Sequence, residues 1–177
     1  MAELVKIDPK SIGVGQYQHD VNQSALKKAL ALTVESCVNY VGVELNTASC
    51  ELLFFVSGIG KTAANNIVDF RKSKGAFKSR KELLKVCKLG AKAFEQCAGF
   101  LRIRDSLYPL DNSAIHPEAY SVVEKMADDD HLSLQEIIGD EKLIAMIEIE
   151  KYVTDDFGIP TLEDILKELK KPSRDPR

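Results

Sequence analysis

A stretch of the chain repeats itself at an offset of 30 residues, and this repeat limits the possible folds more than any other feature. The matched positions are apolar, small or glycine: Leu53 and Leu83, Val56 and Val86, Ile59 and Leu89, Gly60 and Gly90, Ala63 and Ala93. A repeat this short is a supersecondary unit that cannot bury an apolar face alone, but two copies packed together can. We therefore expect a unit built from two similar pieces.

Each copy has the pattern of a short helix, a tight turn and a second helix. In the first copy, Asn46 or Thr47 is expected to cap the first helix. Gly58 and Gly60 then flank Ile59, and they allow a sharp reversal because glycine tolerates positive φ and close backbone approach. The second helix is expected at about residues 61–71, where apolar residues recur at helical spacing.

The second copy repeats this order with different polar residues. It opens with Ser79-Arg80-Lys81-Glu82, which has the pattern of a capping box. The turn is expected at Lys88-Leu89-Gly90, and the closing helix at residues 91–99. An amphipathic helix over residues 21–41, with Asp20 as its N-cap, is expected to brace both copies.

The order apolar, glycine, apolar, glycine between two short helices resembles the helix-hairpin-helix motif. A glycine turn that leads directly into a helix leaves backbone N–H groups free, and these attract anions together with the helix dipole. We therefore predict that the hairpins bind phosphate groups, and that lysines just beyond them add charge-assisted hydrogen bonds. The residues expected to bind nucleic acid are Gly58, Ile59, Gly60, Lys61, Lys88, Gly90 and Lys92, with Lys78, Arg80 and Lys81 in the surrounding basic field.

The sequence leaves two points of this prediction open. Lys88 replaces the first glycine of the second hairpin, which either binds phosphate through its lysines or serves only as a structural partner. The glycines of the first hairpin also fit a turn that merely permits close packing, with the lysines as a solvated face. Phe77, between Ala76 and Lys78, is the aromatic residue that we would test for base stacking.

Charge is distributed unevenly along the chain. Residues 1–50 carry a net charge of −1, residues 51–104 carry +8, and residues 105–177 carry −10. A middle module with this charge could meet a polyanion, whereas the last module should repel one. We expect an all-α fold with an entry segment (1–20), a brace helix with the tandem helix-hairpin-helix unit (21–104), a small acidic helical domain (105–171) and a linker (172–177).

Nothing in the sequence indicates catalysis, a metal site or a cofactor. The cysteines Cys37, Cys50, Cys87 and Cys97 lack metal-ligand spacing, and the histidines lie far apart. No apolar run approaches the roughly 20 residues that span a bilayer. We therefore expect a monomeric binding module without enzymatic activity, cofactor, metal ion or membrane partner.

Longer stretches carry a more specific resemblance: residues 45–49, 56–60, 77–86 and 89–103, with 15–21, 116–118 and 151–155 in the flanks. Together they resemble the Tex family of bacterial transcription accessory proteins over nearly the whole chain. The resemblance implies a role in transcription, a cytoplasmic location and nucleic-acid binding, to DNA, RNA or both, without strong sequence preference. Members of that family place an OB-fold RNA-binding domain after this region, so residues 172–177 are expected to lead to such a domain, absent here.

Two main function classes follow from these observations. The first is a nucleic-acid-binding module that contacts the phosphate backbone. The second is a protein-interaction scaffold that docks the transcription machinery through the acidic half, with hairpins that only pack. Some DNA-repair glycosylases and lyases also use this hairpin, but they need a catalytic aspartate or lysine in a downstream pocket, and the sequence shows no such constellation. Residues 45 to about 86 also resemble the DNA-binding module of competence proteins, which does not account for the acidic half.

Overall fold

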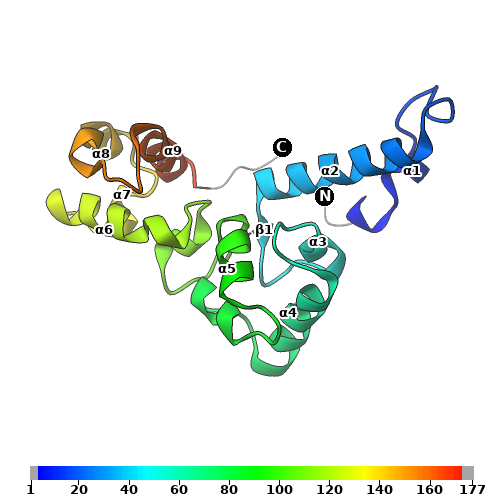
Figure 1. Cartoon of the computed structure of the whole chain (residues 1–177). Coiled ribbons are helices and arrows are strands. Elements are labelled where there is room, and N and C mark those ends of the chain that lie inside the picture. The colour runs from blue at the N-terminus through cyan, green and yellow to red at the C-terminus, as the bar shows by residue number, and fades with distance from the viewer. Residues whose placement is uncertain (1–3, 173–177) are drawn as a thin grey trace.

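The structure, a computed structural model, describes residues 4–172, so nearly all of the expected linker at 172–177 lies outside the described residues. The α-helices are α1 (Pro9–Ile12), α2 (Gln23–Val41), α3 (Cys50–Phe54), α4 (Lys61–Lys74), α5 (Ala91–Cys97), α6 (Tyr120–Asp129), α7 (Leu134–Ile137), α8 (Glu141–Met146) and α9 (Ile159–Lys170). Short 3₁₀-helices lie between them: η1 (Leu4–Lys6), η2 (Arg80–Lys85), η3 (Ala98–Phe100), η4 (Pro109–Asn112), η5 (Pro117–Ala119) and η6 (Ile149–Tyr152). The fold is all-α, as expected, and the helices form two units that lie side by side (Figure 1). The core of the first unit is drawn from residues 38–103 and the core of the second unit from residues 110–169.

The sequence repeat is also a repeat of backbone hydrogen bonds. The bonds that turn the chain recur at the same offset: Val56 N to Leu53 O and Val86 N to Leu83 O, Ile59 N to Val56 O and Leu89 N to Val86 O, Ala64 N to Gly60 O and Phe94 N to Gly90 O. Their lengths lie between 2.9 and 3.2 Å. The apolar residues of both turns are buried, which confirms that the two copies share one core.

Two very short parallel strands close this first unit. In β1 (Val43–Glu44) and β2 (Leu101–Arg102), Val43 pairs with Leu101 and Glu44 with Arg102. The pair joins the chain just before the first copy to the chain just after the second. The core beneath it runs from Val38 to Ile103.

The second copy opens differently from the first. Its first helix, predicted as a short helix, is the 3₁₀-helix η2, whereas the first helix of the first copy is the α-helix α3. The predicted capping box is wrong, because the side chain of Ser79 makes no capping hydrogen bond and the Glu82 carboxylate accepts from Lys78 N. The backbone N–H of Arg80 instead donates to the carboxylate of Asp111 in the second unit. A contact distant in sequence has therefore replaced the local cap.

Two other predicted caps fall on neighbouring residues. Ser49, and neither Asn46 nor Thr47, caps α3, because its hydroxyl accepts from Leu52 N. The Asn46 amide is bound elsewhere: it donates to Phe77 O at 3.0 Å and accepts from Phe77 N at 2.8 Å. Asn22 caps α2 in place of Asp20.

Helix α2 contacts the first unit through its C-terminal turns only. Val38 is its buried residue, while Asn39 and Glu35 accept hydrogen bonds from the backbone and the hydroxyl of Ser57 in the first hairpin. The other end of α2 extends away together with α1 (Figure 1). The expected brace therefore holds the first hairpin and also contacts η3, at the end of the second copy.

The second unit packs α6 to α9 around a separate core. That core includes Leu110, Val123, Met126, Ile144 and Leu162. A capping box opens α7, with reciprocal hydrogen bonds between Ser133 and Glu136. Helix α9 begins at Ile159, with Gly158 as its N-cap.

Among the described residues, no helix has the length and apolar character that crossing a membrane requires.

Candidate nucleic-acid interface

The first hairpin presents unbonded backbone amides at the start of α4. Gly58 has φ of 82°, which a glycine adopts without strain, and Gly60 is the N-cap with φ −77° and ψ 165°. No side chain caps α4, and its first backbone hydrogen bond runs from Ala64 N to Gly60 O. The backbone N–H groups of Lys61, Thr62 and Ala63 therefore have no hydrogen-bond partner among residues 4–172. This is the geometry that binds anions.

Ile59 has a different role from the one predicted. Its side chain is only 4% exposed, and its backbone N–H donates to Val56 O at 3.0 Å. Neither group is available to a phosphate. Ile59 instead anchors the hairpin in the core and leaves the glycines on either side exposed.

The two hairpins pack against each other's helices in the same way. A Cβ atom placed on Gly58 would lie 2.7 Å from Gln96 Cβ and 3.1 Å from Ala93 O of α5. Reciprocally, Asn66 of α4 donates from Nδ2 to Cys87 O of the second hairpin at 2.7 Å. Asn66 and Gln96 occupy equivalent positions in the repeat. Extending the sequence match to this polar pair could have predicted that the two hairpins lie together.

Three lysines near the hairpin turns are exposed and carry no ion pair. Lys61, Lys88 and Lys92 have no carboxylate within 4.0 Å among the residues that the structure describes. Other basic residues of the segment are paired: Lys72 with Asp69, Lys85 with Glu82, Arg104 with Glu44. Gly58, Gly60, Lys61, Lys88, Gly90 and Lys92 are all exposed, and each hairpin lies against the second helix of the other copy.

Lys88 holds a backbone conformation that suits glycine. Its φ is 62°, close to the 82° of the equivalent Gly58. A side chain in this left-handed region costs roughly 1–2 kcal/mol, while a glycine there costs about 0.5–1 kcal/mol of unfolded-state entropy. The second hairpin thus keeps the turn of the first but adds a charged side chain at its tip.

Replacing Lys88 by glycine is expected to raise the free energy of unfolding by about 0.5–1 kcal/mol, because the strain is relieved. Urea denaturation followed by circular dichroism measures this change. The converse variant, Gly58→Lys, is the control and should destabilise, since its Cβ would meet Gln96 Cβ at 2.7 Å. A less stable Lys88→Gly variant would contradict the assignment of strain.

Arg80 does not belong to this surface, so its predicted role is wrong. The side chain is 1% exposed and lies at the junction of the two units. Its guanidinium donates to the carbonyl oxygens of Leu101, Ser113 and Ile115 and to the hydroxyl of Tyr120. Every guanidinium nitrogen is thereby bonded within the protein, and none is left for a phosphate.

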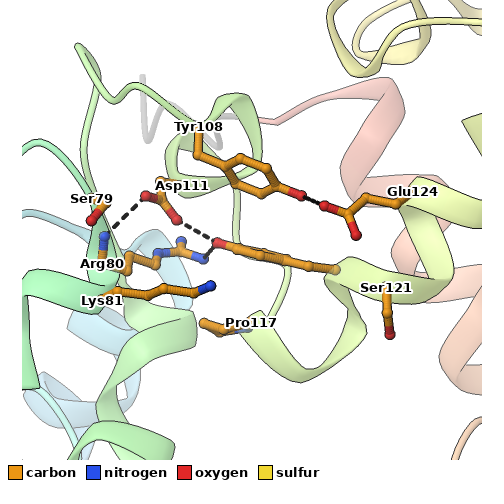
Figure 2. Close-up of a pocket in the computed structure, with 9 residues that line it drawn as sticks. Ser79, Arg80, Lys81, Tyr108, Asp111, Pro117, Ser121 and Glu124 are labelled. Carbon is orange, nitrogen blue, oxygen red and sulfur yellow. Dashed lines mark hydrogen bonds between the residues drawn. The ribbon is translucent and has the colours of Figure 1, made fainter.

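The Arg80 cluster continues into the second unit. Burial raises the pKa of the Tyr120 hydroxyl, so it stays neutral and donates to Asp111 Oδ1 at 2.7 Å. Figure 2 shows this chain of hydrogen bonds in the wall of a pocket of about 360 Å³. Lys81 extends along the same pocket below Arg80 (Figure 2).

Lys78 and Lys81 lie near the connection between the two units, and not at the hairpin turns. The carbonyl of Lys78 accepts from Leu107 N and Ser106 Oγ in the connection between the units. Both side chains are exposed, so they contribute to the basic field at the junction and not at the hairpin turns.

Phe77 is a core residue, and the suggestion that it stacks on bases is wrong. It is 1% exposed and stacks on Phe70, with ring centroids 4.9 Å apart. Among the described residues, no group of three histidine, cysteine or carboxylate side chains is placed to hold a metal ion. Burial raises the pKa of the Cys97 thiol to about 12, so it is not ionised at neutral pH.

Comparison with known proteins agrees with this geometry. Residues 38–102 match the family model of the helix-hairpin-helix motif, and residues 108–177 match that of the HHH domain. The transcriptional accessory protein Tex of Neisseria gonorrhoeae is 58% identical over all 177 residues. The chain is homologous over its full length to a segment of Tex. Protein YhgF of Escherichia coli (strain K12) is 54% identical over the same 177 residues.

The chain spans 23% of the length of both of these relatives. Part of the Tex-like segment also occurs in a human protein, S1 RNA-binding domain-containing protein 1, which is 52% identical over 103 residues. That match covers 58% of this chain and 10% of the human protein. The Tex resemblance predicted from sequence is thus confirmed, and two consecutive helix-hairpin-helix regions are present.

Proposed function

We propose that this chain binds the sugar-phosphate backbone of nucleic acid through its first unit, as part of a transcription accessory protein. The observation that carries the proposal is the uncapped N-terminus of α4, with exposed Gly58, Gly60 and Lys61 at its start. The helix dipole, the free backbone amides and the Lys61 ammonium group, which has no ion pair among the described residues, all attract a phosphate at the same point. The DNA and RNA backbones both offer that group.

The second hairpin contributes through its side chains. Gly90 is an N-cap without a side-chain hydrogen bond, as Gly60 is, and the exposed Lys88 and Lys92 lie on either side of it. We propose Gly58, Gly60, Lys61, Lys88, Gly90 and Lys92 as the binding residues. Lys78 and Lys81 add to the field from the junction, Ile59 anchors the first hairpin, and Arg80 has no part in binding.

Backbone contacts carry no information about base sequence. Binding should therefore be nearly independent of sequence and sensitive to salt. If about four phosphates are neutralised, the slope of log K against log salt concentration should be on the order of −3 to −4.

Replacing Gly60 by aspartate tests the proposal without disturbing the fold. Gly60 has an extended backbone with no atom within 4 Å of an added Cβ, so any residue fits there. Aspartate is a good N-cap and should stabilise α4 by a few tenths of a kcal/mol. Its carboxylate would nevertheless occupy the anion site, so affinity for an oligonucleotide should fall about tenfold or more. Fluorescence anisotropy titration at low salt measures the affinity.

Two variants serve as controls for Gly60→Asp. Gly60→Asn caps the helix without a charge and should weaken binding less. Gly158→Asp places the same carboxylate at the equivalent N-cap of α9, where φ is −81° and ψ is 168°, and should leave binding unchanged. If Gly60→Asp and the unaltered chain have equal affinity and equal thermal stability, the first hairpin is not the contact site.

The acidic second unit supports a second proposal, docking of the transcription machinery. It carries the net charge of −10, and Met146 and Val153 on it are 74% and 45% exposed. A chain that shows no binding to either nucleic acid at low salt would favour this alternative. In both cases we propose a monomeric, non-catalytic module. A role in transcription would place it in the cytoplasm.

A further inference from the structure

The pocket of Figure 2 lies where the two units meet, between the start of η2 and the start of α6. This cavity of about 360 Å³, the junction pocket, is lined by residues 79–81 of the first unit and by residues at or next to η4, η5 and α6 of the second. Ligand sites are often cavities of roughly 300–1,000 Å³ at the boundary between two units. The size and the place of the junction pocket are therefore those of a binding site.

The second unit gives the junction pocket an apolar wall. The side chains of Tyr108, Tyr120 and Pro117 lie along it (Figure 2). Both tyrosine hydroxyls already donate within the protein, Tyr108 to Glu124 and Tyr120 to Asp111. The tyrosines therefore offer the pocket carbon surface and no spare O–H donor. A large apolar side chain gains free energy when it leaves water for such a wall.

Polar groups without a partner accompany this wall. Lys81 is exposed, and its ammonium group has neither a hydrogen bond nor an ion pair among residues 4–172. In the same range, the hydroxyls of Ser79 and Ser121 form no hydrogen bond either. They lie on opposite sides of the pocket (Figure 2). An ammonium group and hydroxyl donors bind a carboxylate or a phosphate oxygen.

The surrounding charge favours a single carboxylate over a phosphate polymer. Asp111 and Glu124 line the same pocket, and residues 105–177 carry a net charge of −10. A nucleic-acid strand through the pocket would continue over this acidic unit and be repelled by it. A single carboxylate can pair with Lys81 without extending over the second unit. A cationic group is disfavoured as well, because it would meet both Lys81 and the buried Arg80.

We infer that the junction pocket docks a segment of a partner protein in which a large apolar side chain is next to an aspartate or a glutamate. The apolar side chain lies along Tyr108, Tyr120 and Pro117, and the carboxylate pairs with Lys81. This site is separate from the proposed phosphate site, because none of the hairpin residues lines the pocket. The chain can therefore hold nucleic acid and a protein partner at the same time.

Two dipeptides that differ by one charge test the inference. The probes are phenylalanyl-aspartate and phenylalanyl-asparagine, each acetylated at the N-terminus and amidated at the C-terminus, titrated into the ¹⁵N-labelled 177-residue chain. The aspartate probe is expected to bind about threefold to fivefold more tightly, because only it pairs with the Lys81 ammonium group. Its binding should shift the backbone amide signals of residues 79–81 and 120–124 in NMR spectra.

Two pairs of variants complete the test. Lys81→Gln should bind both dipeptides equally, whereas Lys78→Gln, which removes an exposed lysine outside the pocket, should keep the preference for aspartate. Ser121→Phe places a ring in the pocket and should weaken both dipeptides about tenfold or more. Asp128→Phe places the same ring on α6 two turns further on, at an exposed position outside the pocket, and should leave both affinities unchanged.

The outcomes separate this inference from the proposed function. No binding of either dipeptide, equal affinities for the unaltered chain, or a preference for aspartate that persists in Lys81→Gln would each overturn the docking site. If an oligothymidylate of about 12 nucleotides displaces the dipeptide, the pocket belongs to the nucleic-acid surface and the inference falls. Gly60→Asp should leave dipeptide binding unchanged, so the loss of either proposal leaves the other standing.

Discussion

Replacing Arg80 by methionine is expected to lower the free energy of unfolding by about 3–5 kcal/mol. The side chain is 1% exposed and joins the two units through four acceptors. Nε donates to Leu101 O at 2.7 Å, and Nη1 donates to Ile115 O at 2.6 Å and to the Tyr120 hydroxyl at 2.7 Å. Methionine fills much of the volume but leaves these buried acceptors without donors, and each unsatisfied group costs free energy.

Urea denaturation monitored by circular dichroism measures this loss. Lys81→Met is the matched control: it makes the same change one residue along at an exposed position and should stay within about 0.5 kcal/mol. Arg80→Lys keeps the positive charge but loses the planar guanidinium group with its fixed set of donors, so it should also lower the free energy of unfolding. An Arg80→Met variant as stable as Lys81→Met would contradict the view that Arg80 fastens the units together.

The hairpins could be predicted from sequence because their geometry is encoded locally. Apolar residues at matched positions enter the core, and a glycine at residue 58 permits the positive φ. Since each turn is closed by hydrogen bonds between residues at most four positions apart, the repeated pattern of residues predicts the repeated pattern of bonds.

The roles of the arginines could not be predicted in this way. In sequence, Arg80 looks like any other member of a basic segment, yet its partners lie 21 to 40 residues away. Arg71 likewise donates to the carbonyl oxygens of Leu45 and Ala48, 26 and 23 residues earlier. Arg102 is 7% exposed and pairs with Glu168 of α9 at 3.8 Å. Part of the positive charge in this segment therefore holds the fold together and is not available to a polyanion.

Phe77 and Tyr40 show the same limit for aromatic residues. Phe77 lies between Ala76 and Lys78, which made it the residue to test for base stacking, but Asn46 fixes its backbone and Phe70 covers its face. Tyr40 lies on a helix with mixed apolar spacing, and only the packing of α2 against the first hairpin shows that its ring borders a groove. Exposure of a ring is a property of the assembled fold.

Neutralising the three hairpin lysines together is expected to weaken binding on the order of a hundredfold near physiological salt. Lys61, Lys88 and Lys92 carry no ion pair among the described residues, so their charge is available to phosphate. Each phosphate contact releases counterions, and at about 0.15 M salt each is worth roughly fivefold in affinity. Three such contacts multiply to about a hundredfold.

The salt dependence distinguishes these lysines from charge in general. In Lys61→Gln/Lys88→Gln/Lys92→Gln, the log–log slope should fall from about −3 or −4 to about −1, because roughly one phosphate contact remains. The matched control Lys10→Gln/Lys27→Gln/Lys28→Gln removes the same charge from α1 and from the end of α2 that extends away from the hairpins. It should keep the steep slope, because its lysines lie beyond the contact surface. Equal slopes for the two triple variants would mean that net charge, and not the hairpins, attracts the nucleic acid.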